Sequence, residues 1–375
     1  AIRLEFIDLK SQYQRLQDRI DARIKTVLTH GHFILGPEVR ELEQQLAEYC
    51  GVRHAIGVAN GTDALQLALM ALEVGPGDAV LTTAFSFFAT AEVIPLVGAR
   101  PVFVDMREDT FNIDPNALEQ AIAEHDATRH GKLRAVIAVD LFGLPADYPR
   151  LEAICKKHNL YLIEDAAQSF GGAIGTRKAG SFGDVATTSF FPAKPLGCYG
   201  DGGAVFTNSD ELASVLKSLR VHGKGTDKYD NVRIGLNSRL DTLQAAILLE
   251  KLTVLDEERE RKQEVLTRYN EHLQGAFAVP GIPEGYVSAI AQYTLRIEAE
   301  KRGGIQDRLG KVGVPTQVYY HRALHRQPAL QAYTGTAHCP VSDRLSGEVL
   351  SLPIHAYLNN HDQDKVIEAL LDGSR

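Results

Sequence analysis

Residues 134–165 read RAVIAVDLFGLPADYPRLEAICKKHNLYLIED, and the fold prediction starts from this stretch. Two short apolar runs, at 134–140 and 160–165, each end in an acidic residue and are separated by a segment of helical character. Strands that are apolar on both faces and alternate with helices are typical of a parallel sheet covered by helices on both sides. The stretch therefore predicts one strand, helix and strand unit of an α/β fold.

Apolar runs of the same kind occur on both sides of this unit, bounded by turn residues. They are HAIGVA (54–59), AVLTT (79–83), PVFVD (101–105), VATTSF (185–190) and AVFTN (204–208). We expect them to be further strands of the same sheet. Two amphipathic helices precede them, one ending at His30-Gly31 and one beginning at Pro37. The prediction is a large α/β domain over residues 1–240 with a mostly parallel central sheet.

The C-terminal third has a different texture. Residues 241–266 begin apolar and become highly charged, which predicts one long helix that leaves the core and runs along the surface into another domain. We then expect a strand in AQYTLRIEA (291–299), a helix at about 304–311 and a closing helix at about 361–372. These elements predict a connector helix and a smaller C-terminal α/β domain over residues 241–375.

The composition is that of an ordinary globular protein, with 375 residues, 44% hydrophobic and 23% charged, and a net charge of −8. Lys and Arg are dispersed, so we predict neither a nucleic-acid partner nor a membrane surface. No apolar run approaches the about 20 residues that span a bilayer, and the first residues lack a basic and then apolar leader, so we expect a cytoplasmic protein. The four cysteines lack CxxC spacing, so neither a disulfide framework nor a zinc site is predicted.

Asp165 ends the predicted strand LYLIED, at the edge of the sheet where α/β folds bind ligands. A functional carboxylate is one interpretation. The alternative is a helix N-cap, and Gln168 three residues later fits a capping box.

Lys194 is the one lysine in SFFPAKPLGCYGDGGA (189–204), among aromatic, proline and glycine residues. Desolvation favours the neutral amine, which is the form that attacks a carbonyl to make a Schiff base. The alternative is a phosphate-binding or solvated loop lysine.

A phosphate site is indicated at Asn60-Gly61-Thr62, between a predicted strand and the helix ALQLALMAL. Free N–H groups at a helix start bind anions, although a capped helix start looks the same. The hydroxyl of Ser189 could contact the same phosphate.

A ring-stacking site is indicated in the loop after AVLTT, which contains Phe85, Phe87 and Phe88. These side chains could stack on a planar ring, although aromatic residues more often belong to the core.

Two other patterns are set aside. The glycines from Gly197 to Gly203 lack GxGxxG spacing and lead into a strand, so no dinucleotide site is predicted. His321 and His325 are spaced like zinc ligands, but position 322 is Arg and no third ligand is evident, so no metal is predicted.

Together the candidate residues describe one ligand. Pyridoxal 5′-phosphate (PLP) has a phosphate for Gly61 and Thr62, a ring for Phe87, a ring nitrogen for Asp165 and an aldehyde for Lys194. We therefore predict PLP as the cofactor, with Lys194 forming the Schiff base.

Five motifs, in order, carry a resemblance to a known family. They are NGTDALQLAL (60–69), EDAAQSFG (164–171), SFFPAKPLGCYGDGGA (189–204), GLNSRLDTLQAA (235–246) and SLPIHAYL (351–358). This set resembles the sugar aminotransferases of the DegT/DnrJ/EryC1/StrS family. The resemblance implies a fold type I PLP-dependent aminotransferase and a homodimer whose active sites lie at the subunit interface.

The resemblance also implies roles for individual residues. Lys194 corresponds to the Schiff-base lysine, Asp165 to the partner of the ring nitrogen and Gln168 to the residue that bonds the phenolic oxygen. Phosphate contacts are implied for Gly61, Thr62 and Ser189, ring stacking for Phe87, and a phosphate contact from the other subunit for Asn237.

Within the family, the chain is most similar to enzymes that aminate UDP-2-acetamido-2-deoxy-3-oxo-glucuronate for bacterial surface polysaccharide such as the O-antigen of lipopolysaccharide. We predict glutamate as the simplest amino donor, and the resemblance implies a cation for the sugar carboxylate. Candidates for sugar binding are Arg239, Tyr320, His321 and His325. The last three lie in the stretch 319–325, which departs from the family's HYPxPLHxQP motif. Alternatives are another UDP- or dTDP-linked 3- or 4-ketosugar, a dehydratase, in which histidine would replace Lys194, and a regulatory protein without chemistry.

Overall fold

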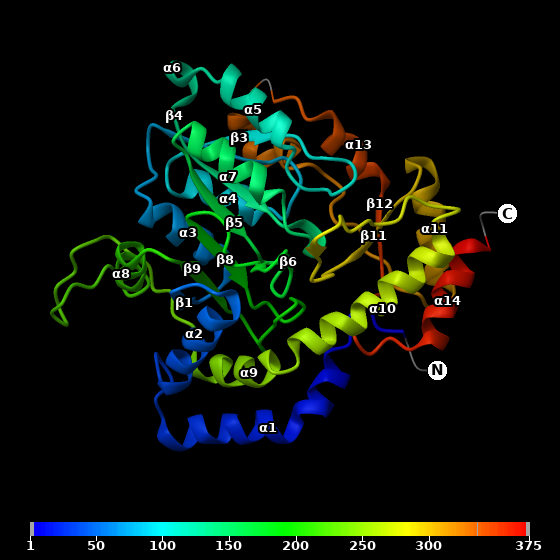
Figure 1. Cartoon of the computed structure of the whole chain (residues 1–375), viewed down its shortest axis with the longest axis horizontal. Helices are drawn as coiled ribbons and strands as arrows, with labels where there is room; N and C mark the ends of the chain where they lie inside the picture. The colour runs from blue at the N-terminus through cyan, green and yellow to red at the C-terminus, as the bar shows by residue number, and fades with distance from the viewer. Residues whose placement is uncertain (1–3, 336, 373–375) are drawn as a thin grey trace.

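The computed structural model describes residues 4–335 and 337–372. Its centre is a seven-stranded sheet (Figure 1) made of β1 (His54–Val58), β2 (Asp78–Thr83), β3 (Arg100–Val104), β4 (Lys132–Val139), β5 (Tyr161–Asp165), β8 (Val185–Ser189) and β9 (Gly203–Thr207). The order is β1-β9-β8-β5-β4-β2-β3. Among these strands β9 alone runs opposite to the others, antiparallel to both β1 and β8. The predicted mostly parallel sheet is confirmed, and each predicted run lies on a strand.

Helices cover both faces of the sheet, because successive side chains of each strand point in opposite directions. On β5, Ile163 belongs to the hydrophobic cluster that holds the buried side chains of α3 (Gly61–Ala71), α4 (Ala89–Leu96) and α8 (Asp210–Leu219). The neighbouring Leu162 packs on the other face, against α5 (Pro115–Glu124) and α7 (Tyr148–Lys157). The two-sided burial explains why these strands read as continuous apolar runs.

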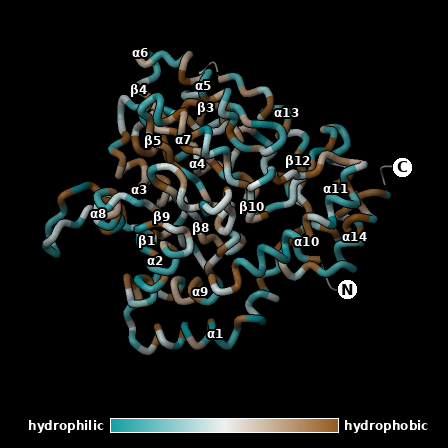
Figure 2. The backbone as a smooth tube through the Cα atoms, viewed as in Figure 1, coloured by the Kyte–Doolittle hydropathy of each residue, from teal (hydrophilic) through white to brown (hydrophobic). Residues whose placement is uncertain are grey.

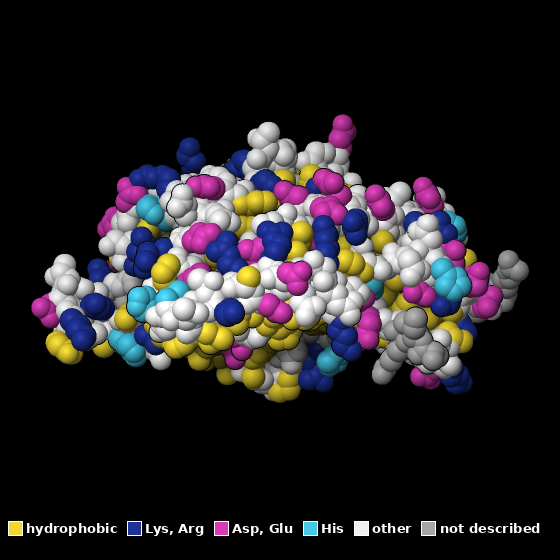
Figure 3. Space-filling model, turned by 90° about the horizontal axis from the view of Figure 1, so that it is seen from below, with side chains coloured by type: hydrophobic (Ala, Val, Ile, Leu, Met, Phe, Trp, Pro, Cys, Tyr) yellow, Lys and Arg dark blue, Asp and Glu magenta, His cyan; other side chains and the backbone are white. Residues whose placement is uncertain are grey.

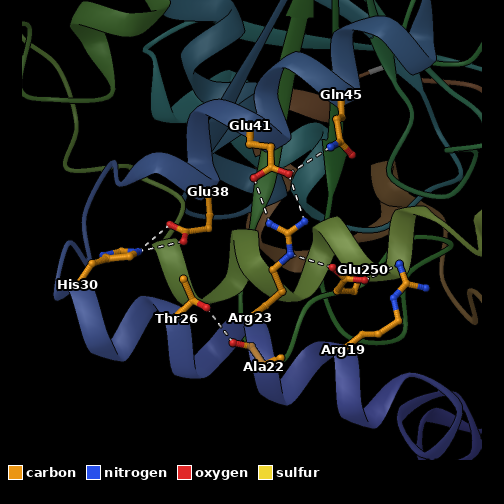
Figure 4. A network of polar contacts seen from close by, with 9 residues as sticks. All are labelled: Arg19, Ala22, Arg23, Thr26, His30, Glu38, Glu41, Gln45 and Glu250. Atoms are coloured by element: carbon orange, nitrogen blue, oxygen red, sulfur yellow. Dashed lines mark hydrogen bonds and ion pairs between the residues drawn. The ribbon is translucent and has the colours of Figure 1, made fainter.

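The two N-terminal helices are α1 (Leu9–His30) and α2 (Pro37–Cys50), as predicted. Helix α1 ends because Gly31 adopts a φ of +72°, a left-handed conformation that glycine takes without strain. Figure 4 shows α1 joined by charged side chains to α2 and to α9 (Thr242–Leu252). Arg23 lies at the centre, where it donates to Glu41 of α2 and to Glu250 of α9.

The predicted long connector helix is wrong in one respect, because it is two helices. Helix α9 ends at Leu252, and α10 (Leu255–Leu273) begins after a break at Thr253 and Val254. The N–H groups of both break residues donate to the carbonyl three residues before rather than four, which tightens and ends the helix. Val254 packs with Leu16 of α1. Helix α9 is largely buried and α10 is more hydrophilic (Figure 2).

The C-terminal part has a hydrophobic cluster of its own, built by α10, α11 (Ala299–Lys311), α14 (Asn360–Leu371) and the antiparallel pair β11 (Tyr293–Arg296) and β12 (Val349–Leu352). The predicted strand and closing helix are confirmed. Helix α11 begins at Ala299 rather than at 304. The prediction placed the start too late because Gly303 and Gly304, which lie inside the helix, are residues that often mark the end of a helical pattern. The domain boundary at residue 240 stays a prediction.

The remaining elements are short, except for α13. They are α6 (Ala127–His130), α12 (Gln331–Thr334), α13 (Pro340–Glu348), β6 (Ala173–Ile174), β7 (Arg177–Lys178), β10 (Tyr286–Val287) and 3₁₀ turns at Leu141–Gly143, Leu324–Arg326 and Pro328–Leu330. In the part of the chain that the structure describes, no helix has both the length and the apolar character that a membrane span requires.

Candidate active site

Asp165 lies at the carboxyl end of β5 and is buried. Its carboxylate accepts hydrogen bonds from the Thr90 hydroxyl at 2.9 Å and from the Ala167 N–H at 3.2 Å. Residues 167–171 form a turn and not a helix, so the alternative that Asp165 caps a helix is wrong. Burial raises the pKa of Asp165, and the two donors and nearby Lys194 oppose that rise.

Lys194 is carried by the turn that follows β8. The backbone N–H of Lys194 donates to the Phe191 carbonyl at 2.7 Å, and the backbone N–H of Cys198 donates to the Phe190 carbonyl at 2.8 Å. These two hydrogen bonds hold the backbone of the turn in place. Burial lowers the pKa of the Lys194 amine, with the charge of Asp165 acting in the opposite direction. Among the described residues the amine has no hydrogen-bond or ion-pair partner. The Lys194 amine is thus unpaired, and it lies near enough to Asp165 for each charge to affect the pKa of the other group.

The start of α3 meets the end of β8, the strand that precedes the Lys194 turn. A methyl group added at Gly61 would lie 2.7 Å from the Ser189 Cβ, so a side chain there would collide. Asn60 caps the helix by accepting from the Asp63 N–H at 2.8 Å. The N–H groups of Gly61 and Thr62 belong to the first turn, where no helical acceptor exists. The close approach of Gly61 and Ser189 forms a cradle of the kind that phosphate occupies.

Gln168 has a defined orientation. Its Oε1 accepts from the Phe142 N–H at 2.7 Å, which turns its Nε2 toward Tyr320, whose hydroxyl accepts at 3.2 Å. One N–H of the amide remains for a ligand. Burial raises the pKa of Tyr320, so its hydroxyl is neutral and can also donate.

The aromatic residues after β2 divide into two environments. Phe85 is 1% exposed and packs edge-on to Tyr320, with ring centroids 6.0 Å apart. Phe87 is 56% exposed. The exposed ring is thus available to cover a planar ligand, whereas Phe85 belongs to the core.

Four other predicted residues form no hydrogen bond or ion pair with Asp165, Lys194 or Gln168. Asn237 and His321 are exposed, and Arg239 is half-buried. His325 is buried beside Asp343, with Nε2 and Oδ1 3.2 Å apart, and beside the ring of Phe103. Their roles stay predictions. Tyr320, by contrast, lies against Gln168.

Thr90 is the site residue that the sequence did not indicate. It lies in the first turn of α4, and its hydroxyl reaches Asp165, 75 positions along the chain. Neither a motif nor a spacing links the two positions, so the sequence carried no signal for this contact.

The residues present fit PLP. The cradle at Gly61 and Ser189 suits the phosphate, Asp165 is a buried acceptor for a ring nitrogen, and Lys194 is an unpaired amine. An α/β sheet that presents such a carboxylate and amine at its strand ends is the arrangement of a PLP-dependent enzyme.

The particular family follows from the sequence over almost the whole chain. Residues 14–371 match the model of the DegT/DnrJ/EryC1/StrS aminotransferase family. The chain belongs to this family, and the predicted resemblance is confirmed.

Individual relatives agree with this assignment. A Pseudomonas aeruginosa protein named UDP-2-acetamido-2-deoxy-3-oxo-D-glucuronate aminotransferase is 48% identical, over 95% of this chain and 96% of its own length. A Geobacillus stearothermophilus protein named pleiotropic regulatory protein is 42% identical, over 98% and 97%.

Solved structures share the fold. A DegT DnrJ EryC1 StrS aminotransferase from Brucella abortus is 50% identical, with a TM-score of 0.96 over 98% of this chain and 99% of that chain. NtdA from Bacillus subtilis, with bound cofactor PMP, is 29% identical, with a TM-score of 0.89 over 99% of this chain and 85% of that chain. The predicted α/β fold of an aminotransferase is confirmed.

Proposed function

We propose that this protein is a PLP-dependent aminotransferase that transfers an amino group from glutamate to a nucleotide-linked ketosugar. The observation that carries the proposal is the proximity of the Lys194 amine to the Asp165 carboxylate, without a hydrogen bond or ion pair between them. Burial favours the neutral, nucleophilic form of the lysine, and the aspartate lies close enough for the two charges to affect each other's pKa.

Each residue then has a defined task. PLP, when bound, supplies an aldehyde that accepts the amino group and a ring that withdraws electrons. Lys194 would hold the cofactor until the amino donor takes its place, and its freed amine would then move the proton at the donor Cα. Asp165 would hold the ring nitrogen in its protonated form. The same two residues would serve when the ketosugar is the amino acceptor.

The remaining contacts orient the ring. Gly61, Thr62 and Ser189 would hold the phosphate, and the free N–H of Gln168 would bond the phenolic oxygen. Phe87 would cover one face of the ring. These groups hold the ring still while the proton moves.

The proposed acceptor is UDP-2-acetamido-2-deoxy-3-oxo-glucuronate, and the proposed pathway makes bacterial surface polysaccharide such as O-antigen. The name of the Pseudomonas relative supports this substrate. A sugar carboxylate needs a cation, and Arg239 has no ion-pair partner among the described residues. Another UDP- or dTDP-linked 3- or 4-ketosugar is the second candidate.

Two other functions are less well supported. A dehydratase of the family has histidine where this chain has Lys194. A regulatory role has the name of the Geobacillus relative in its favour, but such a role requires neither a half-buried, unpaired amine nor the buried carboxylate near it.

A homodimer with active sites at the interface, in the cytoplasm, completes the proposal. Large hydrophobic side chains are exposed at Phe33, Ile34, Phe87, Phe191 and Ile234. Figure 3 shows hydrophobic side chains gathered along the lower edge of that view. A second copy would cover such a surface, and Asn237 would reach the partner's phosphate site.

A visible absorption spectrum tests the function. Protein incubated with PLP should absorb in the visible, and glutamate alone should bleach that band. Borohydride trapping followed by mass spectrometry should place the label on Lys194. Lys194→Ala should lose the label, whereas exposed Lys217→Ala should keep it. A colourless protein, or a label on a different residue, would refute the proposal, and a panel of UDP- and dTDP-ketosugars would identify the acceptor.

A further inference from the structure

Two buried hydroxyl groups, those of Ser86 and Thr90, are linked to Asp165 by two successive hydrogen bonds. The Ser86 and Thr90 hydroxyl oxygens are 3.0 Å apart, and Thr90 in turn lies 2.9 Å from the Asp165 Oδ2. Ser86 is 3% exposed and Thr90 is 1% exposed, so solvent does not replace either hydroxyl.

The chemistry of the groups sets the direction of this chain. An ionised carboxylate only accepts hydrogen bonds, whereas a protonated one can also donate, so the Thr90 hydrogen points to Asp165 in the ionised state of the aspartate. Thr90 has a single hydrogen, so it can only accept from Ser86, and Ser86 is the donor. Hydrogen bonds that run in one direction polarise one another, which strengthens the last donor in the chain.

The last donor, Thr90, bonds to Asp165, and burial disfavours the charged form of that aspartate. Burial raises the pKa of Asp165, and the bond from Thr90 lowers it. When a buried aspartate faces a ring nitrogen, their one shared proton can rest on either partner. A donor to the carboxylate favours the ionised aspartate and so leaves the proton on the nitrogen.

We propose that Ser86 and Thr90 form a directional hydroxyl relay that keeps Asp165 ionised and the ring nitrogen of the cofactor protonated. Thr90 is a positioning residue, acting through Asp165. This inference rests on the proposed function.

The relay also connects the loop that carries Phe87 with the carboxylate of Asp165. Ser86 and Thr90 flank Phe87, and the Thr90 N–H donates to the Phe87 carbonyl at 3.3 Å. The loop that presents the exposed Phe87 ring is therefore tied to the carboxylate at the end of β5. The relay would therefore hold in place both Phe87, which would cover one face of the cofactor ring, and Asp165, which would contact the ring nitrogen.

The test measures the ring proton directly. Protein loaded with PLP that carries ¹⁵N in the ring is examined by ¹⁵N NMR across a pH series, because the ¹⁵N shift depends on ring protonation. Thr90→Val keeps the shape and removes the hydroxyl, Thr90→Ser keeps the hydroxyl, and Ser86→Ala removes the first donor. Thr82→Val is the matched control, since Thr82 is a buried threonine whose hydroxyl bonds the Ile137 carbonyl instead.

We expect a protonated nitrogen in the wild type and in the Thr82→Val control. Thr90→Val should shift the proton equilibrium toward the unprotonated ring by about tenfold, the value of one hydrogen bond to a charged group. Ser86→Ala should cause a smaller shift in the same direction, and Thr90→Ser should restore the wild-type signal. The rate of the glutamate half-reaction should follow the same order.

An unchanged ¹⁵N signal in Thr90→Val would overturn the relay and leave the proposed function intact. Equal shifts in Thr90→Val and Thr82→Val would also overturn it, because a general packing effect would then explain both. A wild-type protein that binds no PLP would instead refute the proposed function, and the relay with it. Should Thr90→Val fail to fold, Ser86→Ala and Thr90→Ser decide the question.

Discussion

Gln168 and Tyr320 are hydrogen-bonded across 152 positions of sequence, with the amide Nε2 donating to the phenol oxygen at 3.2 Å. The bond joins the turn after β5 to the segment that follows α11. The C-terminal part of the chain therefore completes the environment of the residue proposed to bond the cofactor's phenolic oxygen.

Tyr320→Phe should slow the glutamate half-reaction by about fivefold, because the loss of one acceptor leaves the Gln168 amide less firmly oriented. Stopped-flow bleaching of the visible band measures the rate. Gln168→Ala should cost at least as much, since it removes the amide itself. A rate in Tyr320→Phe equal to that of the wild type would show that the Phe142 bond alone orients Gln168.

Gly61→Ala should weaken PLP binding by about tenfold or more, because the added methyl would meet Ser189 Cβ at 2.7 Å and overpacking costs about 1–3 kcal/mol. Titration of the apoprotein with PLP measures the dissociation constant. Gly310→Ala is the matched control: it is a helical glycine of α11 with nothing within 4 Å of an added methyl. The idea of a close cradle fails if both variants bind PLP like the wild type.

Lys251 links stability to pH. It is buried in α9, its ammonium donates to the Gly197 carbonyl at 2.5 Å, and burial lowers its pKa to about 8 from 10.5. Because the folded pKa is the lower one, the unfolded chain binds more protons between pH 8 and 10.5, and this residue's contribution to stability rises with pH over that window.

The wild type should therefore gain stability relative to Lys251→Met as pH rises from 8 to 10.5, by up to about 3 kcal/mol. Urea unfolding of both proteins across the pH series measures the difference. Exposed Lys217→Met should show no such trend. A difference that is constant with pH would mean that Lys251 titrates alike in both states.

Arg23→Ala should lower the free energy of unfolding by about 1–2 kcal/mol, because its guanidinium joins α1 to Glu41 and to the buried Glu250. Arg19→Ala is the matched control, since Arg19 pairs with the same Glu250 but its side chain is 53% exposed against 32% for Arg23. We expect about 0.5 kcal/mol or less for Arg19. Equal losses in urea unfolding would contradict the view that Arg23 is the central contact.

The sequence predicted the elements whose signals are local. The runs at 134–140 and 160–165 are strands β4 and β5, and Gly31 ends α1. These signals depend on side-chain period and on the backbone freedom of single residues, which act over a few positions. The same local reasoning missed the break at Thr253 and Val254, because the helical spacing of side chains continues through it while the hydrogen bonds do not.

For the site, the sequence by itself identified Lys194, Asp165 and Gly61 as candidates, since their residue types and neighbours carry the chemistry. Only the tertiary structure decided that Thr90 donates to Asp165, that Gln168 faces Tyr320 and that Phe85 is core while Phe87 is exposed. Thr90 reaches Asp165 because α4 follows β2 and the strands lie in the order β5-β4-β2, which brings the end of β5 near the start of α4. That order follows from packing over the whole sheet, and no short stretch of residues encodes it.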